Sequence, residues 1–302
     1  MQIYFLYIVS IIIWGTTWIA IKFQLELVNP IVSVFYRYAI AFLILFVYCI
    51  IKKEKIFRYS LKDHFIMILL GFFLFSINYW LVYLAEQELT SGLVAVLFAF
   101  LVFMNVFNGF IFMKLKINIK VIIGAIIGII GIVLIFLPEI LSFGFTKKEF
   151  IALTIGLISV FLASVGNIIS AISSTRGIPV LHSNTFGMAY GTLLMLIISL
   201  IAGCEFIIPT TTSYIISLFY LAIFGSIVAF GTYLTLVSRV GADKASYVIM
   251  VVPVVALIIS TLFEDYQWTI ESFIGIFLVM FGNLFLKNKK TYKNNDIREV
   301  TI

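Results

Sequence analysis

Runs of about twenty apolar residues recur along the whole chain, and short polar connections separate them. A helix of that length crosses about 30 Å of hydrocarbon at roughly 1.5 Å per residue. Of the 302 residues, 63% are hydrophobic and only 11% are charged, whereas a soluble domain is roughly 45–50% apolar and 25% charged. These values exclude a water-soluble globule, and the chain is predicted to be an all-α membrane protein.

A hydropathy window of about nineteen residues predicts ten transmembrane helices. The predicted spans cover residues 3–21, 31–51, 65–85, 93–113, 121–137, 150–172, 185–202, 215–237, 245–263 and 270–286. The short connections leave no room for a soluble catalytic domain, and the sequence contains no GxxxxGK[ST] phosphate loop. ATP is therefore excluded as the direct energy source, and neither a cofactor nor a metal is expected.

The distribution of basic residues predicts the orientation, because Lys and Arg in short loops favour the cytoplasmic side. With both termini in the cytoplasm, all but four of the 20 basic residues lie on that side. The exceptions are Lys22, Lys147 and Lys148 on the opposite side and Arg37 inside a span. The net charge of +6 thus reflects a multi-pass protein of the inner (cell) membrane. It favours the lipid bilayer as a partner and gives no reason to expect nucleic acid.

Paired glycines and tyrosines recur at a separation of about 150 residues, which indicates an internal repeat. Examples are Gly71 with Gly225 and Tyr79 with Tyr233. The predicted domains are a five-helix repeat over 1–145, a second over 146–290 and a basic cytoplasmic tail over 291–302. Because five is odd, the two repeats are inverted relative to each other, an arrangement that puts a substrate path near the membrane midplane.

Several segments carry a resemblance to a known family. They are WGTTWIAIK (14–22), NPIVSVFYR (29–37), NYWLVYLAEQELTSGLVAVLFAF (78–100) and GAIIGIIGIVL (124–134), with weaker echoes in 225–253 and 275–282. They resemble EamA-type permeases of the drug/metabolite transporter superfamily. The resemblance implies a ten-helix transporter with inverted five-helix halves, in a family associated with export of amino acids, other metabolites and toxic compounds. The chain departs from the family pattern where Ala99 replaces the counterpart of Pro253, and where an acidic residue is missing near Met113.

Arg37 is the most prominent polar residue inside a predicted span, about 10 Å below the outer boundary by the helical rise. A charge at that depth is costly and persists mainly beside a partner or a cavity. Two interpretations are open. Arg37 could hold the carboxylate or phosphate of a substrate, or it could fix its helix to Glu86 at the outer end of the third span.

Two stripes of aromatic residues predict a cavity. In the first span Trp14, Trp18 and Lys22 follow at helical spacing, with Thr17 alongside. In the third span Tyr79, Tyr83 and Glu86 form a similar stripe next to Asn78. Aromatic walls with a few hydrogen-bonding groups suit a small molecule that has an apolar part. The alternative is an interfacial belt and ordinary packing, although Trp14 lies too deep for a belt.

Polar and small residues in other spans have packing and path-lining interpretations. Asn105 and Asn108 in the fourth span, and Ser164, Asn167 and Ser170 in the sixth, favour hydrogen bonds between helices. Asn167 and Tyr233 are also candidates to line the path from the second half. Five glycines favour close packing of helices, with a homodimer as the open alternative. These glycines are Gly124, Gly128, Gly131, Gly187 and Gly191.

No Asp or Glu falls in the middle of a predicted span, so the usual proton carrier is missing there. Lys22 and Glu86, near the outer surface, are the candidates for gating or coupling. Facilitated export and exchange linked to Glu86 both fit the sequence.

The predicted function is that of a secondary transporter that exports small metabolites, amino acids or amphipathic toxic compounds by alternating access. Uptake of a nutrient is the second possibility, and a membrane scaffold without transport is the third. An intramembrane enzyme is disfavoured, because the spans contain only isolated Ser, Thr and Tyr groups in place of a nucleophile with its base.

Overall fold

The computed structural model describes residues 2–25, 27–113, 119–141, 146–240 and 247–284. Every regular element in these ranges is helical. The elements are α1 (Gln2–Leu25), α2 (Pro30–Ile51), η1 (Ile56–Arg58), α3 (Leu61–Leu74), α4 (Ile77–Glu86), α5 (Ser91–Ala99), α6 (Leu101–Met113), α7 (Ile119–Leu141), α8 (Lys147–Thr175), α9 (Val180–Ile201), α10 (Thr212–Tyr220), η2 (Leu221–Val228), α11 (Ala229–Val240), α13 (Tyr247–Phe263) and α14 (Ile270–Leu284).

Seven described helical segments are long and apolar enough to cross a membrane. They coincide with the predicted spans one to four and six to eight. Three shorter apolar helices, Ile122–Leu137, Val251–Phe263 and Ile270–Gly282, fall on the other three predicted spans. The chain is thus an all-helical, multi-pass membrane protein, while the count of ten crossings stays a prediction. The basic tail over 291–302 lies outside the described residues.

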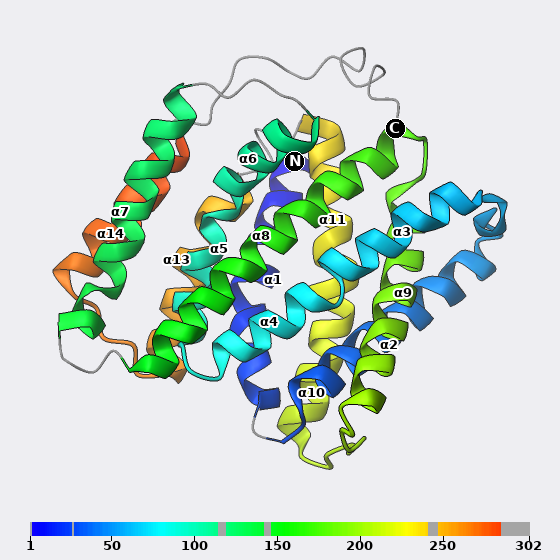
Figure 1. The fold of residues 1–302 in the computed structure, drawn as a ribbon, viewed down its shortest axis with the longest axis horizontal. Coiled ribbons are helices and arrows are strands. Elements are labelled where there is room, and N and C mark those ends of the chain that lie inside the picture. The colour runs from blue at the N-terminus through cyan, green and yellow to red at the C-terminus, as the bar shows by residue number, and fades with distance from the viewer. Residues whose placement is uncertain (1, 26, 114–118, 142–145, 241–246, 285–302) are drawn as a thin grey trace.

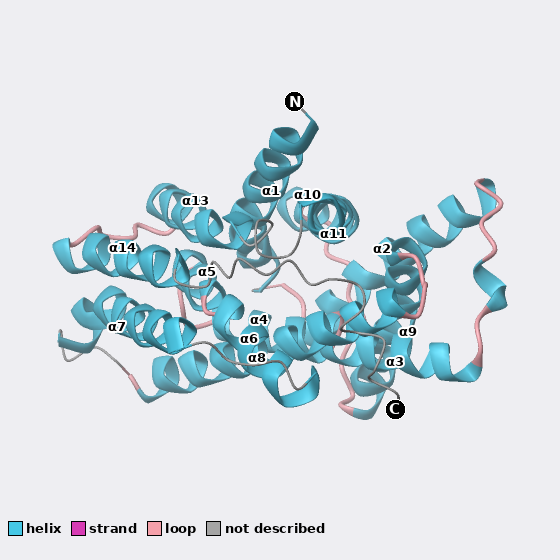
Figure 2. Cartoon of the chain, turned by 90° about the horizontal axis from the view of Figure 1, so that it is seen from above, coloured by secondary structure: helices cyan, strands magenta, loops and turns pink. Residues whose placement is uncertain are grey.

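The two halves of the chain are interleaved. Helix α7 packs along α14, α2 along α9, and both α1 and α5 along α13. Helix α8 of the second half lies against α3, α4 and α6 of the first. Figure 2 shows α7 and α14 side by side at one edge of the bundle, and α2, α3 and α9 at the opposite edge. The centre is therefore bounded by helices from both halves (Figure 1).

Glycines allow several of these contacts to form at backbone distance. A Cβ atom added at Gly131 would lie 2.6 Å from the carbonyl oxygen of Gly275, and one at Gly282 would lie 2.5 Å from that of Gly124. A Cβ atom at Gly71 would lie 2.5 Å from the oxygen of Gly187. The predicted close packing by these glycines is thus present within one chain, and it joins the two halves.

The third helix of each half is interrupted near its middle. In the first half α3 ends before Ser76, whose backbone is not helical (φ −138°, ψ −88°). The hydroxyl of Ser76 lies 2.8 Å from the carbonyl oxygens of Gly71 and Phe72 and donates there, and Gly71 also accepts from the backbone nitrogen of Phe75. In the second half a π-helical segment, η2, separates α10 from α11. π-Helical turns disturb the regular ladder and occur frequently at functional sites.

The fourth helix of the first half is interrupted as well, although it lacks a proline. Helix α5 ends at Ala99, and α6 begins two residues later at Leu101. The counterpart of Ala99 is Pro253, which lies inside α13. Proline usually breaks a helix, yet Pro253 lies inside the continuous helix α13, whereas α5 ends at Ala99.

Candidate functional site

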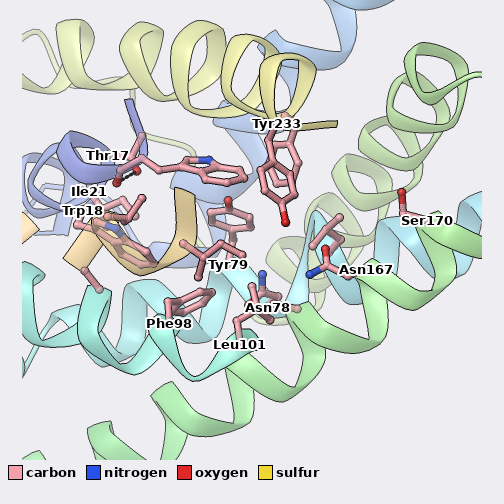
Figure 3. Close-up of a pocket in the computed structure, with 17 residues that line it drawn as sticks. Thr17, Trp18, Ile21, Asn78, Tyr79, Phe98, Leu101, Asn167, Ser170 and Tyr233 are labelled. Carbon is pink, nitrogen blue, oxygen red and sulfur yellow. Dashed lines mark hydrogen bonds between the residues drawn. The ribbon is translucent and has the colours of Figure 1, made fainter. Parts of the chain in front are cut away.

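A cavity of about 90 Å³ lies between the two halves (Figure 3). One water molecule needs roughly 10–15 Å³ by this measure, so the cavity has room for several waters or a compact organic molecule. Its walls come from α1, α3, α4, α5 and α6 of the first half and from α8, α11 and α13 of the second. The break at Ser76 lies two residues before the lining residue Asn78, and the break at Phe100 directly precedes the lining residue Leu101.

Aromatic rings form much of the cavity wall. Trp14 contacts Phe230 and Tyr233 of α11, with ring centroids 5.7 and 4.9 Å apart. Trp18 packs on Phe98 of α5 at 4.8 Å. Contacts at these distances are within the favourable range for aromatic pairs, so the rings hold one another in place. The wall is therefore apolar, rigid and shared between α1, α5 and α11.

Hydrogen-bonding groups gather on one side of the cavity. Figure 3 shows Tyr233 reaching across toward Asn78 and Asn167. Asn167 donates from its Nδ2 atom to Oδ1 of Asn105 on α6 over 3.3 Å, and Asn108 donates to Ser164 over 2.9 Å. The predicted hydrogen bonds between helices are thus present, and the bond to Asn105 fixes the amide of Asn167 where it lines the cavity.

Two buried polar atoms of lining residues lack a hydrogen-bond partner in the described part of the chain. They are Oδ1 of Asn78 and the indole Nε1 of Trp18. A buried donor or acceptor without a partner costs about 1–3 kcal/mol. A bound solute could therefore form hydrogen bonds with the acceptor on Asn78 and the donor on Trp18.

Arg37 does not line the cavity. Its side chain is buried, and its guanidinium lies over the ring of Tyr79, with Cζ 4.4 Å from the ring centroid. Nε donates to Oγ of Ser226 in η2 over 3.0 Å. Within the described residues no ion pair joins Arg37 to Glu86, so the predicted lock between them is wrong. Arg37 instead fixes α2 to the π-helical segment of the other half.

The remaining predicted residues lie away from the cavity as well. Tyr83, one turn beyond Tyr79, donates from its hydroxyl to Oε1 of Gln24 over 2.7 Å. Lys22 forms an ion pair with Glu264, with 3.6 Å between Nζ and Oε1. Glu86 ends α4 and is fully buried. These residues occupy the end of the bundle opposite the N-terminus, where α1 and α4 finish (Figure 1).

The structure thus brings together seven of the nine residues predicted to bind substrate, while their role in binding stays a prediction. The seven are Trp14, Thr17, Trp18, Asn78, Tyr79, Asn167 and Tyr233. Sequence reasoning missed Phe98 and Phe230 as lining residues. Phe230 precedes Tyr233 by three positions and so shares its helix face, a signal that could have found it. Phe98 has no comparable signal in an almost wholly apolar span.

The fold and the cavity define a class of protein, a helical multi-pass membrane protein that encloses a solute-sized space between two interleaved halves. Comparison with known protein families agrees with this class. The model of the EamA-like transporter family matches the chain twice, at residues 1–137 and 150–287. The chain belongs to this family.

Relatives with similar sequences carry transporter names without a stated substrate. An uncharacterized transporter of Buchnera aphidicola subsp. Schizaphis graminum is 26% identical over 92% of this chain and 93% of its own length. The uncharacterized transporter YoaV of Bacillus subtilis is 25% identical over 90% and 91%. The uncharacterized inner membrane transporter YedA of Escherichia coli is 26% identical over 83% and 79%. The family and these names point to a permease and away from an enzyme.

A crystal structure of another protein has the same fold. It superposes on 94% of this chain and 95% of its own with a TM-score of 0.69, at 14% sequence identity. At that identity the similarity shows the fold alone.

Proposed function

We propose that this chain is a secondary transporter that exports small amphipathic metabolites, amino acids or toxic compounds through the central cavity. The observation that carries the proposal is the cavity itself, which both halves enclose. Among the described residues, an acceptor on Asn78 and a donor on Trp18 in its lining have no hydrogen-bond partner. A scaffold without transport gives no reason for such groups to be buried beside an empty space, because each destabilises the fold.

The lining favours a small solute with an aromatic or apolar part and no net charge. All of its residues are aromatic, aliphatic or neutral and polar. The buried cation Arg37 does not line the cavity, because its guanidinium lies over Tyr79 and its Nε is bonded to Ser226. An anionic substrate would therefore meet no positive charge in the cavity. A neutral or zwitterionic molecule could place its apolar part against the rings of Trp14 and Phe230 and its polar part near Asn78.

Alternating access has a physical basis in the interrupted helices. The break at Ser76 and the segment η2 occupy the third helix of each half, and each ends two residues before a residue that lines the cavity, Asn78 and Phe230. A helix with an interrupted hydrogen-bond ladder bends there at lower cost than an intact one. We place both termini in the cytoplasm on the basis of the Lys and Arg distribution, and we favour export. Uptake is the second candidate, because net flux through such a protein follows the gradients.

A plug variant tests the proposal. Ala163 of α8 lines the cavity and is 3% exposed, so Ala163→Phe would fill part of the space with a ring. Untargeted metabolite profiling of cells and medium would compare cells that express the unmodified chain, cells that express Ala163→Phe and cells with an empty vector. We expect at least one compound to change its distribution only with the unmodified chain.

The matched control is Ile158→Phe on the same helix, because the side chain of Ile158 is 47% exposed on the surface of the helix bundle. It should transport like the unmodified chain. A second plug, Ala95→Phe from α5, protects the test against a variant that fails to fold. Equal profiles for the unmodified chain and both plugs, at equal membrane levels, would contradict transport through this cavity.

A further inference from the structure

Glu86 is a buried carboxyl group that has no hydrogen-bond partner in the part of the chain that the structure describes. Its exposed fraction is 0%, and neither carboxylate oxygen has a hydrogen-bond partner within the described residues. Burial of an unpaired carboxylate costs far more than burial of a neutral polar group. A second species must therefore accompany Glu86, either a bound proton or a neighbouring cation.

The charged groups around Glu86 come from three other elements. Lys22 extends from the end of α1, Glu264 follows α13, and Arg37 projects from α2; these three act on Glu86 electrostatically. Tyr83 lies one turn earlier on α4 itself and donates to Gln24. Arg37 is held by its bond to Ser226 and by its stacking on Tyr79, although its Nη1 has no hydrogen-bond partner in the described part of the chain. Lys22 has one long ion pair and a partly exposed side chain, so of these two cations it changes partner more easily.

Glu264 does not depend on Lys22. Its two carboxylate oxygens each lie 3.0 Å from the backbone nitrogen of Ser91, at the start of α5. The hydroxyl groups of Ser91 and Ser260 also donate to Oε2. A carboxylate at a helix N-terminus is stabilised by the free N–H groups and the helix dipole. The pair between Lys22 and Glu264 is long, at 3.6 Å, and the Lys22 side chain is 27% exposed. Lys22 can thus leave Glu264 without leaving an unsatisfied charge.

We propose that Glu86 is the proton-binding site of this transporter and that Lys22 is its alternating counterion. In one state Glu86 carries the proton and the Lys22 ammonium pairs with Glu264. In the other state the proton has left to solvent, Lys22 pairs with the Glu86 carboxylate, and Glu264 is held by Ser91 and Ser260. The O–H bond of the Glu86 carboxyl is the one covalent bond that breaks, its proton goes to solvent, and the Lys22 ammonium exchanges Glu264 for Glu86 as its ion-pair partner.

A proton fits this site better than a metal ion. A proton needs a single carboxyl oxygen, whereas sodium or calcium needs several oxygen ligands around it. The described residues include no group of three or more His, Cys, Asp or Glu side chains that could hold a metal ion. The ammonium of Lys22 and the guanidinium of Arg37 would also repel a metal cation at this point.

Helix α4 connects this site to the cavity. Tyr79, Tyr83 and Glu86 follow at intervals of three or four positions and therefore share a face of α4. Tyr79 lines the cavity, and Arg37 lies over its ring. A solute that moves Tyr79 would thus act on the helix that ends in Glu86. This coupling rests on the proposed transport function, whereas the proton site itself does not.

Infrared spectroscopy tests proton binding without any substrate. The purified full chain, in vesicles of phosphatidylcholine and phosphatidylglycerol, would be recorded over a series of pH values. The difference spectrum of the unmodified chain minus the Glu86→Gln variant should contain a carboxyl C=O stretch, which a carboxylate band replaces on the alkaline side.

Glu88→Gln is the matched control, because Glu88 is exposed two residues further along the chain. Lys22→Met should retain the C=O band to a more alkaline pH, because the substitution removes a cation that stabilises the carboxylate. A difference spectrum without this band would overturn the proposal, as would a band indifferent to Lys22→Met or an equal change in Glu88→Gln.

Coupling is then tested with a compound that the profiling experiment identifies. Flux through vesicles of the unmodified chain should rise severalfold with an imposed pH gradient, and Glu86→Gln should lose that dependence. Flux that ignores the gradient in the unmodified chain would overturn the coupling and leave transport intact. Sodium-dependent, pH-independent flux would overturn it as well. If no compound is transported, the infrared result still decides the proton site, so the two failures are distinguishable.

Discussion

Arg37 of the first half donates from Nε to Oγ of Ser226 in the second half over 3.0 Å, although 189 residues separate them in the sequence. Ser226 in turn donates to the carbonyl oxygen of Leu221 over 3.0 Å. The hydroxyl therefore serves two purposes, because it satisfies a carbonyl in the π-helical segment and accepts from a buried guanidinium. A single serine thus links the interruption of one half to the central charge of the other.

Ser226→Ala should destabilise the protein by about 1.5–3 kcal/mol, the usual contribution of a hydrogen bond to a charged group. Thermal unfolding of the purified chain in detergent measures the effect as a lower melting temperature. Ser213→Ala is the control, because Ser213 is exposed in α10. Equal melting temperatures for the two variants would show that the bond to Arg37 is not important for stability.

Gly225→Ala should also destabilise the protein, by about 1–3 kcal/mol, because it overpacks a filled region. An added Cβ atom would lie 2.9 Å from Cγ2 of Thr17 and 3.2 Å from Nη2 of Arg37. Gly231→Ala serves for comparison, since an added Cβ atom there meets nothing within 4 Å. That variant should be neutral or more stable, because alanine favours a helix by up to about 1 kcal/mol over glycine. A reversed order in thermal unfolding would refute the packing around Gly225.

Asn78→Leu should have opposite effects on stability and on binding. Oδ1 of Asn78 is buried and has no partner among the residues that the structure describes, so an apolar side chain of similar size should leave the melting temperature unchanged or raise it. The same change removes a group that faces the cavity and should weaken binding of a transported compound. Asn108→Leu provides the contrast, because it breaks a hydrogen bond to Ser164 and should lower the melting temperature. A large loss of stability in Asn78→Leu would contradict a functional reason for this asparagine.

Trp14→Ala should weaken binding of a transported compound by about tenfold, which corresponds to roughly 1.4 kcal/mol of lost contact with one ring. Trp14 lines the cavity, whereas Trp80 does not, although both are partly buried in the bundle. Trp80→Ala should therefore leave the affinity nearly unchanged. Titration of both purified variants measures the difference, and equal losses would remove Trp14 from the binding wall.

Much of the fold could be predicted, because hydrocarbon admits few structures. A helix that satisfies its own backbone is one of them, so the apolar runs predict where helices lie. The stripe of Trp14 and Trp18 likewise predicts which face of α1 lines the cavity, because residues four apart share a face of a helix. Of the stripe of Tyr79, Tyr83 and Glu86, Tyr79 lines the cavity and the other two do not.

The partners of Arg37 and the helix breaks were not predictable in the same way. Helical spacing fixes the face on which Arg37 lies but not which distant helix packs there. Glu86 was thus proposed as its partner where the structure has Ser226. The interruptions at Ser76 and in η2 occur without proline, and the proline of α13 does not interrupt its helix. Tertiary packing decides these points, and a single sequence does not record it.

Solute flux through reconstituted vesicles tests most directly whether the cavity between the two halves is the transport site. Vesicles with the purified chain, with Ala163→Phe or with Ile158→Phe would be loaded with a compound identified by metabolite profiling. We predict saturable flux for the unmodified chain and Ile158→Phe, and a loss of at least about tenfold for Ala163→Phe at equal protein content. Equal flux through all three, or flux no greater than in protein-free vesicles, would contradict transport through this cavity.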